Sequence, residues 1–239
     1  LIININFYQL GQNVLGSASI TSSAIASNGK RISKVGTMNL NSSNWESQKL
    51  SVKTDGNNQA YYTTLHELGH IFGIGLLWTA NSLTDGSRLY TGINAVSEYR
   101  SIFEDQTLSG IPIEDNEYHN DSESELGDND YYVAPQGPNG TADGHPEEGT
   151  EPGFSSDNRY YYNTNGDTHL HPGLDNELMT GVAEAHIGPE PLSRITIGML
   201  DDLGYTVDYT KADYYEKPIT DGYFVGDQLE VSLMSSNGY

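Results

Sequence analysis

Apolar and polar residues alternate with a period of two in residues Ile2–Tyr8, which read IININFY. This alternation is typical of a half-buried β-strand. Residues 34–40 give a second candidate strand. Serine, alanine and glycine are frequent between these two segments, so we expect a loop there.

The best helical pattern covers residues Gln59–Phe72, which contain no proline. Gly73 stands where a helix C-terminal cap is expected. A second helical pattern covers residues 191–203 and ends before Gly204, and we expect a short strand at 205–209 after it. The apolar positions at helical spacing are Leu65, Leu68 and Phe72 in the first segment and Leu192, Ile195, Met199 and Leu203 in the second.

Residues 114–167 are rich in Asp, Asn, Gly, Pro and Tyr and show no sustained period. An irregular segment of this length in a compact domain is usually functional or bound to an ion. Residues 163–167 (NTNGD) and 128–130 (DND) offer clustered oxygen atoms of the kind that calcium binds in irregular loops. We expect either a structural calcium site or a solvated acidic loop here.

Composition limits the classes of protein to which this chain can belong. Its 239 residues (26.2 kDa) are enough for one large domain with a buried core. The formal charge of −22 excludes nucleic acid as the main partner, because the phosphate backbone would be repelled. Because the chain has no cysteine, any metal must be held by His, Asp or Glu. No apolar run approaches the roughly 20 residues of a membrane span.

Residues 66–70 read HELGH and lie inside the first predicted helix. At 3.6 residues per turn, His66 and His70 lie on one face of a helix, so both imidazoles can reach one cation, and neutral imidazole suits zinc. Glu67 stands beside the first histidine, where it can accept a proton from a metal-bound water that attacks a carbonyl. The pattern predicts hydrolysis of peptide bonds, and the alternative is a pair of surface histidines on a helix.

Two histidines do not complete a catalytic zinc site, which usually has a third protein ligand and a water. An acidic third ligand would indicate a thermolysin-like enzyme, and a histidine after a turn at a glycine would indicate a metzincin. Gly73 agrees with the metzincin pattern, but the position of the third histidine in a compact metzincin is occupied by Leu76. The third ligand therefore comes from farther along the chain, where the remaining histidines are His119, His145, His169, His171 and His186.

Four stretches of the chain resemble the leishmanolysin-type metzincins, in which an insert separates the glycine from the third histidine. They are residues 65–78 (LHELGHIFGIGLLW), 140–145 (GTADGH), 176–181 (NELMTG) and 192–209 (LSRITIGMLDDLGYTVDY). The resemblance extends over about residues 36–215. It implies that Met179 is the Met-turn residue, whose thioether forms an apolar floor beneath the zinc-binding histidines. The alternative is an ordinary core methionine.

The same resemblance bears on the third zinc ligand. His145 ends a glycine-rich run that looks like the run ending in the ligand histidine of the family. In the family, however, this histidine lies only a short distance before the Met-turn, which His169 and His171 match better than His145 does. We expect zinc on His66, His70 and His145, with His169 and His171 as the alternatives.

The resemblance implies an α+β fold of the metzincin type in residues 1–215. An N-terminal lobe, about residues 1–75, would carry a twisted mixed sheet and two helices, and a mostly irregular C-terminal lobe, about residues 76–215, would carry one helix. The active-site cleft would run between the lobes, and residues 216–239 would form a C-terminal extension or linker. Because the chain has no cysteine, it looks more like the bacterial or viral members, which implies an extracellular protein, secreted or displayed on a surface or virion.

These observations predict a zinc-dependent endopeptidase that acts on protein or peptide substrates. Zinc on three histidines would lower the pKa of its water, and Glu67 would accept the proton and pass it to the leaving amine. The alternative from another class is a surface or virion structural or adhesion module that retains a metalloprotease-like fold. The complete HELGH segment favours the enzyme. In a chain that no longer needs hydrolysis, mutations should replace Glu67 early.

Overall fold

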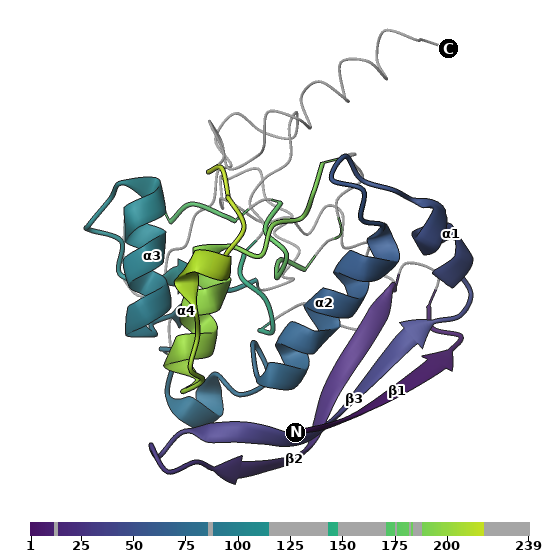
Figure 1. Ribbon diagram of the computed structural model, residues 1–239. Helices are drawn as coiled ribbons and strands as arrows, with labels where there is room; N and C mark the ends of the chain where they lie inside the picture. The colour runs from purple at the N-terminus through teal and green to yellow at the C-terminus, as the bar shows by residue number, and fades with distance from the viewer. Residues whose placement is uncertain are drawn as a thin grey trace, which may run out of the picture.

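The computed structural model describes residues 1–11, 14–85, 88–114, 143–147, 171–174, 176–181, 183 and 188–217. Within these ranges, a three-stranded sheet is combined with helices and a pair of short strands (Figure 1). The bounds are β1 Ile2–Tyr8, β2 Gly16–Ile25, β3 Arg31–Asn41, α1 Trp45–Leu50, α2 Gln59–Phe72, β4 Leu89–Tyr90, α3 Ile93–Phe103, β5 Ile111–Pro112 and α4 Arg194–Asp202. The mixed content of helix and sheet confirms the coarse α+β fold class.

The three-stranded sheet is mixed and has the order β1-β3-β2. β1 runs parallel to β3, with Ile2 opposite Val35, and β2 runs antiparallel to β3, with Gly16 opposite Leu40. The predicted strand Ile2–Tyr8 is confirmed, and the second predicted strand forms part of β3.

The segment before β3 is a strand, β2, so the prediction of a loop there is wrong. Its sequence, GSASITSSAI, consists mainly of small and polar residues, which are also frequent in loops. β2 lies at one edge of the sheet, where β3 pairs with it along most of its length. This tertiary pairing outweighs the weak local preference of the segment for a strand.

Helix α2 packs on one face of the sheet (Figure 1). Ile71 of α2 is fully buried in a small core with Met38 and Leu40 of β3. Gly36 of β3 faces this helix, since a Cβ atom at Gly36 would lie 2.6 Å from Ile71 Cγ2. The missing side chain at Gly36 therefore allows α2 to lie close to the strand.

Helix α2 has the bounds that the sequence predicts. Asn58 caps its first turn by accepting a hydrogen bond from Tyr61 N (3.0 Å). Gly73 follows its last residue with a left-handed φ of 119°, and its N–H donates to the carbonyl oxygens of Gly69 and His70. A residue with a Cβ atom would be strained in this conformation, which explains the glycine at the end of the helix.

A larger hydrophobic core connects α2 with α3 and α4. α3 contributes Ala95, Val96 and Tyr99, and α4 contributes Ile195 and Met199. The expectation of one helix in the C-terminal part is wrong, because α3 forms there in addition to α4. The apolar spacing in α3 (INAVSEYRSIF) is a helical signal that sequence reasoning missed.

The carboxylate of Asp202 connects the end of α4 to the beginning of α3. It accepts hydrogen bonds from Asn94 N (2.9 Å), Ala95 N (3.0 Å) and Tyr90 Oη (3.0 Å). The first N–H groups of a helix have no partner within the helix, so a carboxylate placed there satisfies them. α3 therefore begins at a buried acidic group from a distant part of the chain.

The strand expected at 205–209 is not formed, and this prediction is wrong. Instead, a short 3-10 helix, Tyr209–Lys211, begins at the last residue of this segment. Asp208 begins it by accepting a hydrogen bond from Thr210 N (3.0 Å). A local side-chain bond of this kind competes with strand pairing.

Other sequence predictions are not decided by the fold. The two candidate calcium segments, 128–130 and 163–167, lie outside the described residues. The division into two lobes, the cleft between them and the extension from residue 216 stay predictions. None of the described helices has the length and apolar character that a membrane crossing requires.

We expect Ile71→Ala to lower the free energy of unfolding by about 2–5 kcal/mol, because it leaves a cavity between α2 and β3. Urea denaturation followed by circular dichroism measures the change. Leu50→Ala is the control, since Leu50 is 82% exposed at the end of α1, and its effect should stay within about 0.5 kcal/mol. Equal effects of the two substitutions would contradict the packing of α2 on the sheet.

Candidate metal centre

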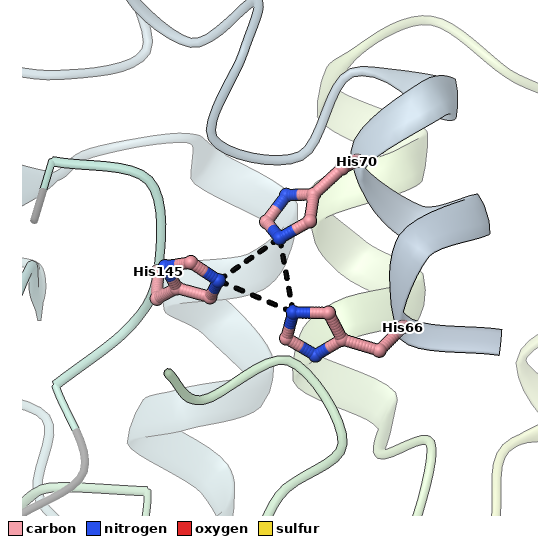
Figure 2. A group of neighbouring side chains, drawn as sticks. All are labelled: His66, His70 and His145. Carbon is pink, nitrogen blue, oxygen red and sulfur yellow. Dashed lines mark hydrogen bonds between the residues drawn. The ribbon is translucent and has the colours of Figure 1, made fainter. Parts of the chain in front are cut away.

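His66 and His70 lie one turn apart on α2 and point toward the same region (Figure 2). His70 is buried and His66 is half-buried. His66 donates from Nδ1 to the carbonyl oxygen of Leu178 (2.7 Å), and His70 donates from Nδ1 to that of Ile74 (3.0 Å). Each ring is thus held by a backbone carbonyl on one side, and its Nε2 atom is directed toward the other histidine.

His145 comes from a short described segment, residues 143–147, far from α2 in the sequence. Backbone hydrogen bonds attach this segment to the chain after α3. Glu114 N donates to His145 O (3.1 Å), and Glu147 N donates to Pro112 O (2.9 Å). These bonds fix the position of the His145 backbone, from which its imidazole ring extends.

A glycine pair brings the segment of His145 next to the end of α2. Gly75, with a φ of +72°, lies against Gly144, and a Cβ atom at Gly75 would collide with the carbonyl oxygen of Gly144. The two backbones can lie in contact only because residue 75 has no side chain. This contact places His145 within reach of the two helical histidines.

The Nε2 atoms of the three histidines converge on one point (Figure 2). They are 3.0 Å apart between His66 and His70, 2.9 Å between His70 and His145, and 3.2 Å between His66 and His145. Three nitrogen atoms that each lie about 2.0–2.1 Å from one tetrahedral zinc ion are roughly 3.3 Å apart. The triangle has nearly this size, and the three histidines lie close enough to bind one metal ion.

The hydrogen bonds at Nδ1 determine what the Nε2 atoms can do. A carbonyl oxygen only accepts, so Nδ1 of His66 and of His70 carries the hydrogen, and Nε2 of each neutral ring has a lone pair. Two lone pairs 3.0 Å apart repel each other unless a cation or a proton lies between them. Donation from the second ring nitrogen to a carbonyl is also the usual arrangement of histidines that bind metals.

Burial favours the neutral form of these rings over a protonated one. Desolvation lowers the pKa of His66. Desolvation, with the neighbouring His145 and His66, lowers the pKa of His70 well below its usual range. Neutral imidazole is the form that binds metals, so a shared metal ion suits this group better than a shared proton.

Glu67 lies next to His66 on α2 and is 5% exposed. Its Oε2 atom is buried and has no hydrogen-bond partner among the described residues. Desolvation raises the pKa of Glu67 to about 8. Its Oε1 atom faces the first residue of β2, because a Cβ atom at Gly16 would lie 2.7 Å from it. A buried carboxyl group on the helix turn that carries two of the histidines is a candidate proton acceptor.

Met179 packs against the turn of α2 that carries the two histidines. Its side chain is fully buried. A Cβ atom at Gly69 would lie 2.5 Å from Met179 Sδ, so the thioether touches the helix where residue 69 has no side chain. Met179 therefore makes an apolar contact with α2 at Gly69, and its role as the Met-turn floor beneath the histidines stays a prediction.

Of the other candidate ligands, only His171 belongs to the described residues. His171 is fully buried away from this group, with Nδ1 2.9 Å from Gly110 O and Nε2 3.3 Å from Ser109 Oγ. His119, His169 and His186 lie outside the described residues. Among the described residues, the structure brings His145, rather than His171, to the two histidines of the HELGH segment.

Sequence reasoning did not identify three residues that shape this site, namely Gly16, Gly75 and Leu178. Gly16 belongs to a segment that was expected to be a loop, and nothing near it in the sequence connects it with Glu67. Leu178 acts through its backbone carbonyl, which no side-chain pattern reveals. Gly75 had a usable signal, since a second glycine so soon after a helix end indicates a further tight turn.

A scan against protein-family models finds no match for this chain, and a search of curated proteins finds no significant match either. The residues and the geometry described above are therefore the basis for assigning a function.

We expect His145→Ala to lose bound metal, because it removes one of three converging imidazoles. The affinity for zinc should fall by more than roughly 10–100-fold, which is the usual effect of losing a residue that only orients a ligand. Mass spectrometry of the metal content after dialysis against zinc measures this. His171→Ala is the matched control and should keep near one zinc per chain. Metal loss in His171→Ala or His169→Ala, but not in His145→Ala, would contradict this ligand set.

Proposed function

We propose that this chain is a zinc-dependent endopeptidase of the leishmanolysin-type metzincin class. The observation that carries this proposal is the convergence of three Nε2 atoms, 2.9–3.2 Å apart, at the turn of α2 that also carries the buried Glu67. The resemblance of four sequence stretches to that family supports the same assignment. The α+β fold is compatible with it.

Zinc suits this set of donors, which consists of three imidazole nitrogens. Three protein ligands are typical of catalytic zinc sites, which keep one position open, whereas structural sites usually have four. No fourth His, Asp or Glu joins the group within the described part of the chain. When bound, zinc supplies Lewis-acid polarisation of a substrate carbonyl and lowers the pKa of a water molecule.

Glu67 acts first as a general base and then as a general acid. Its Oε2 atom accepts a proton from the water that attacks the scissile carbonyl, and it passes this proton to the nitrogen of the leaving amine. Glu67 follows His66 on α2, so the same helix carries the proton acceptor and two of the ligands in both steps. Because Glu67 is desolvated, its carboxylate is a stronger base than an exposed one.

Glu67→Gln tests this function. We expect near one zinc per chain in the wild type and in the variant, and casein hydrolysis by the wild type that a chelator abolishes and added zinc restores. The variant should hydrolyse casein at least about 100-fold more slowly, since it loses the proton acceptor. Glu46→Gln, at an exposed position of α1, is the control and should keep full activity.

Three results would contradict the proposal in different ways. Retained hydrolysis in Glu67→Gln would exclude Glu67 as the base. Bound zinc without hydrolysis by the wild type would favour the structural or adhesion module instead. No zinc after reconstitution would contradict the metal site itself.

A second variant changes the position of Glu67 without removing its carboxylate. In Gly16→Ala the added methyl group would lie 2.7 Å from Glu67 Oε1 and would displace it. We expect unchanged zinc content and hydrolysis slower by up to about 100-fold, the cost of a catalytic group misplaced by about 1 Å. Gly11→Ala is the control, because its methyl group would make only an ordinary contact with Val14 at 3.5 Å. Equal rates in Gly16→Ala and the wild type would contradict this placement of Glu67.

A further inference from the structure

Glu177 is a buried carboxylate outside the group of three histidines. It is 2% exposed and lies between the turn that contains Met179 and the N-terminus of α4. Its Oε2 atom accepts a hydrogen bond from Met179 N (2.7 Å). Its Oε1 atom accepts from Ser193 N (3.0 Å), Ser193 Oγ (2.6 Å) and Thr196 Oγ1 (2.6 Å). One side chain thus connects the turn to the helix.

All of these partners donate to Glu177. The Ser193 hydroxyl accepts from Ile195 N (3.1 Å) and Thr196 N (3.4 Å), so its own hydrogen is free to point at the carboxylate. Three donors at the N-terminus of α4 and one in the turn match a negatively charged acceptor. Burial raises the pKa of Glu177, and the bonds from Ser193, Thr196 and Met179 oppose this rise. In Glu177→Gln, the side-chain NH₂ group would face one of these donors, and that donor would lose its acceptor.

The turn that Glu177 holds contacts α2 at two points. The carbonyl oxygen of Leu178 accepts the hydrogen bond from His66 Nδ1 (2.7 Å). The thioether of Met179 packs on the helix at Gly69. Leu178 and Met179 directly follow Glu177 in the chain, so a shift of the turn moves both contacts.

We propose that Glu177 is a positioning residue for the metal centre: by tying the turn at 177–180 to α4, it holds the Leu178 carbonyl where that oxygen orients the His66 ring. This inference rests on the proposed function, because the direction of the ring matters most if its Nε2 atom binds a metal ion. Groups that orient a ligand histidine in this way contribute strongly to metal affinity.

Asp202 offers a matched comparison within the same chain. It is also a buried carboxylate that accepts from backbone N–H groups and a hydroxyl at the N-terminus of a helix. Its partners, Tyr90, Asn94 and Ala95, belong to β4 and the beginning of α3 rather than to the turn at 177–180. Loss of this carboxylate reports on stability without disturbing the Leu178 carbonyl.

The experiment compares Glu177→Gln with Asp202→Asn. For each variant we would measure the Co²⁺ affinity by competition with a chelator, the visible absorption spectrum of the cobalt-loaded chain, and the melting temperature. We expect both variants to melt below the wild type. Only Glu177→Gln should bind Co²⁺ about tenfold more weakly, the size of effect typical of a lost outer-shell partner. Its cobalt spectrum should also change, because the His66 ring is no longer held in one direction.

Two substitutions at Thr196 keep the inference testable if Glu177→Gln does not fold. Thr196→Val removes one donor from Glu177 Oε1, and Thr196→Ser keeps it. We expect Thr196→Val to weaken Co²⁺ binding by roughly two- to tenfold, the equivalent of one lost hydrogen bond, and Thr196→Ser to keep the wild-type affinity.

The outcomes distinguish this inference from the proposed function. Equal cobalt affinity and spectra in the wild type, Glu177→Gln and Thr196→Val would overturn the inference and leave the metal site in place. An equal loss of affinity in Asp202→Asn would overturn it as well, since the effect would then follow stability alone. A wild-type chain that binds neither Co²⁺ nor Zn²⁺ would overturn the metal site and this inference with it.

Discussion

Two hydrogen bonds from histidine Nδ1 atoms to backbone carbonyls are the constraint on which the metal centre depends. They leave the Nε2 atoms of His66 and His70 with lone pairs that point at each other and at His145. In buried surroundings a shared cation converts this repulsion into three favourable bonds. The two carbonyls come from different parts of the chain: Ile74 is the second residue after the end of α2, whereas Leu178 belongs to a turn that is distant in the sequence. His70 is therefore oriented by the end of its own helix, and His66 by the way the turn at 177–180 is held to α4.

Glycines allow the separate segments of the site to approach one another. The site combines α2, the beginning of β2, the segment at 143–147 and the turn at 177–180. At each junction a methyl group would overlap an atom of the neighbouring segment. The contacts are Gly69 with Met179, Gly75 with Gly144, and Gly16 with Glu67. Small residues at these points have the same role in the site that Gly36 has between β3 and α2, since they bring a rigid element close to its neighbour.

Local features could be predicted because their causes lie within a few residues in the sequence. The helix Gln59–Phe72 has the expected bounds, since apolar periodicity and the glycine after it act over one or two turns. The alternation in Ile2–Tyr8 marked a strand for the same reason. α3 carries an equally local signal, because its apolar positions also recur at helical spacing.

The pair of histidines on one helix face, with a glutamate after the first of them, could be predicted from local spacing alone, because residues 66–70 translate directly into helix geometry. Long-range packing made β2 a strand, since its pairing with β3 outweighs its composition. It also decided which described histidine lies beside the helical pair. His145 reaches α2 through backbone bonds and a contact with Gly75, and neither has a signature in residue spacing. The Leu178 carbonyl is likewise a backbone atom, so only the folded chain could show that it orients His66.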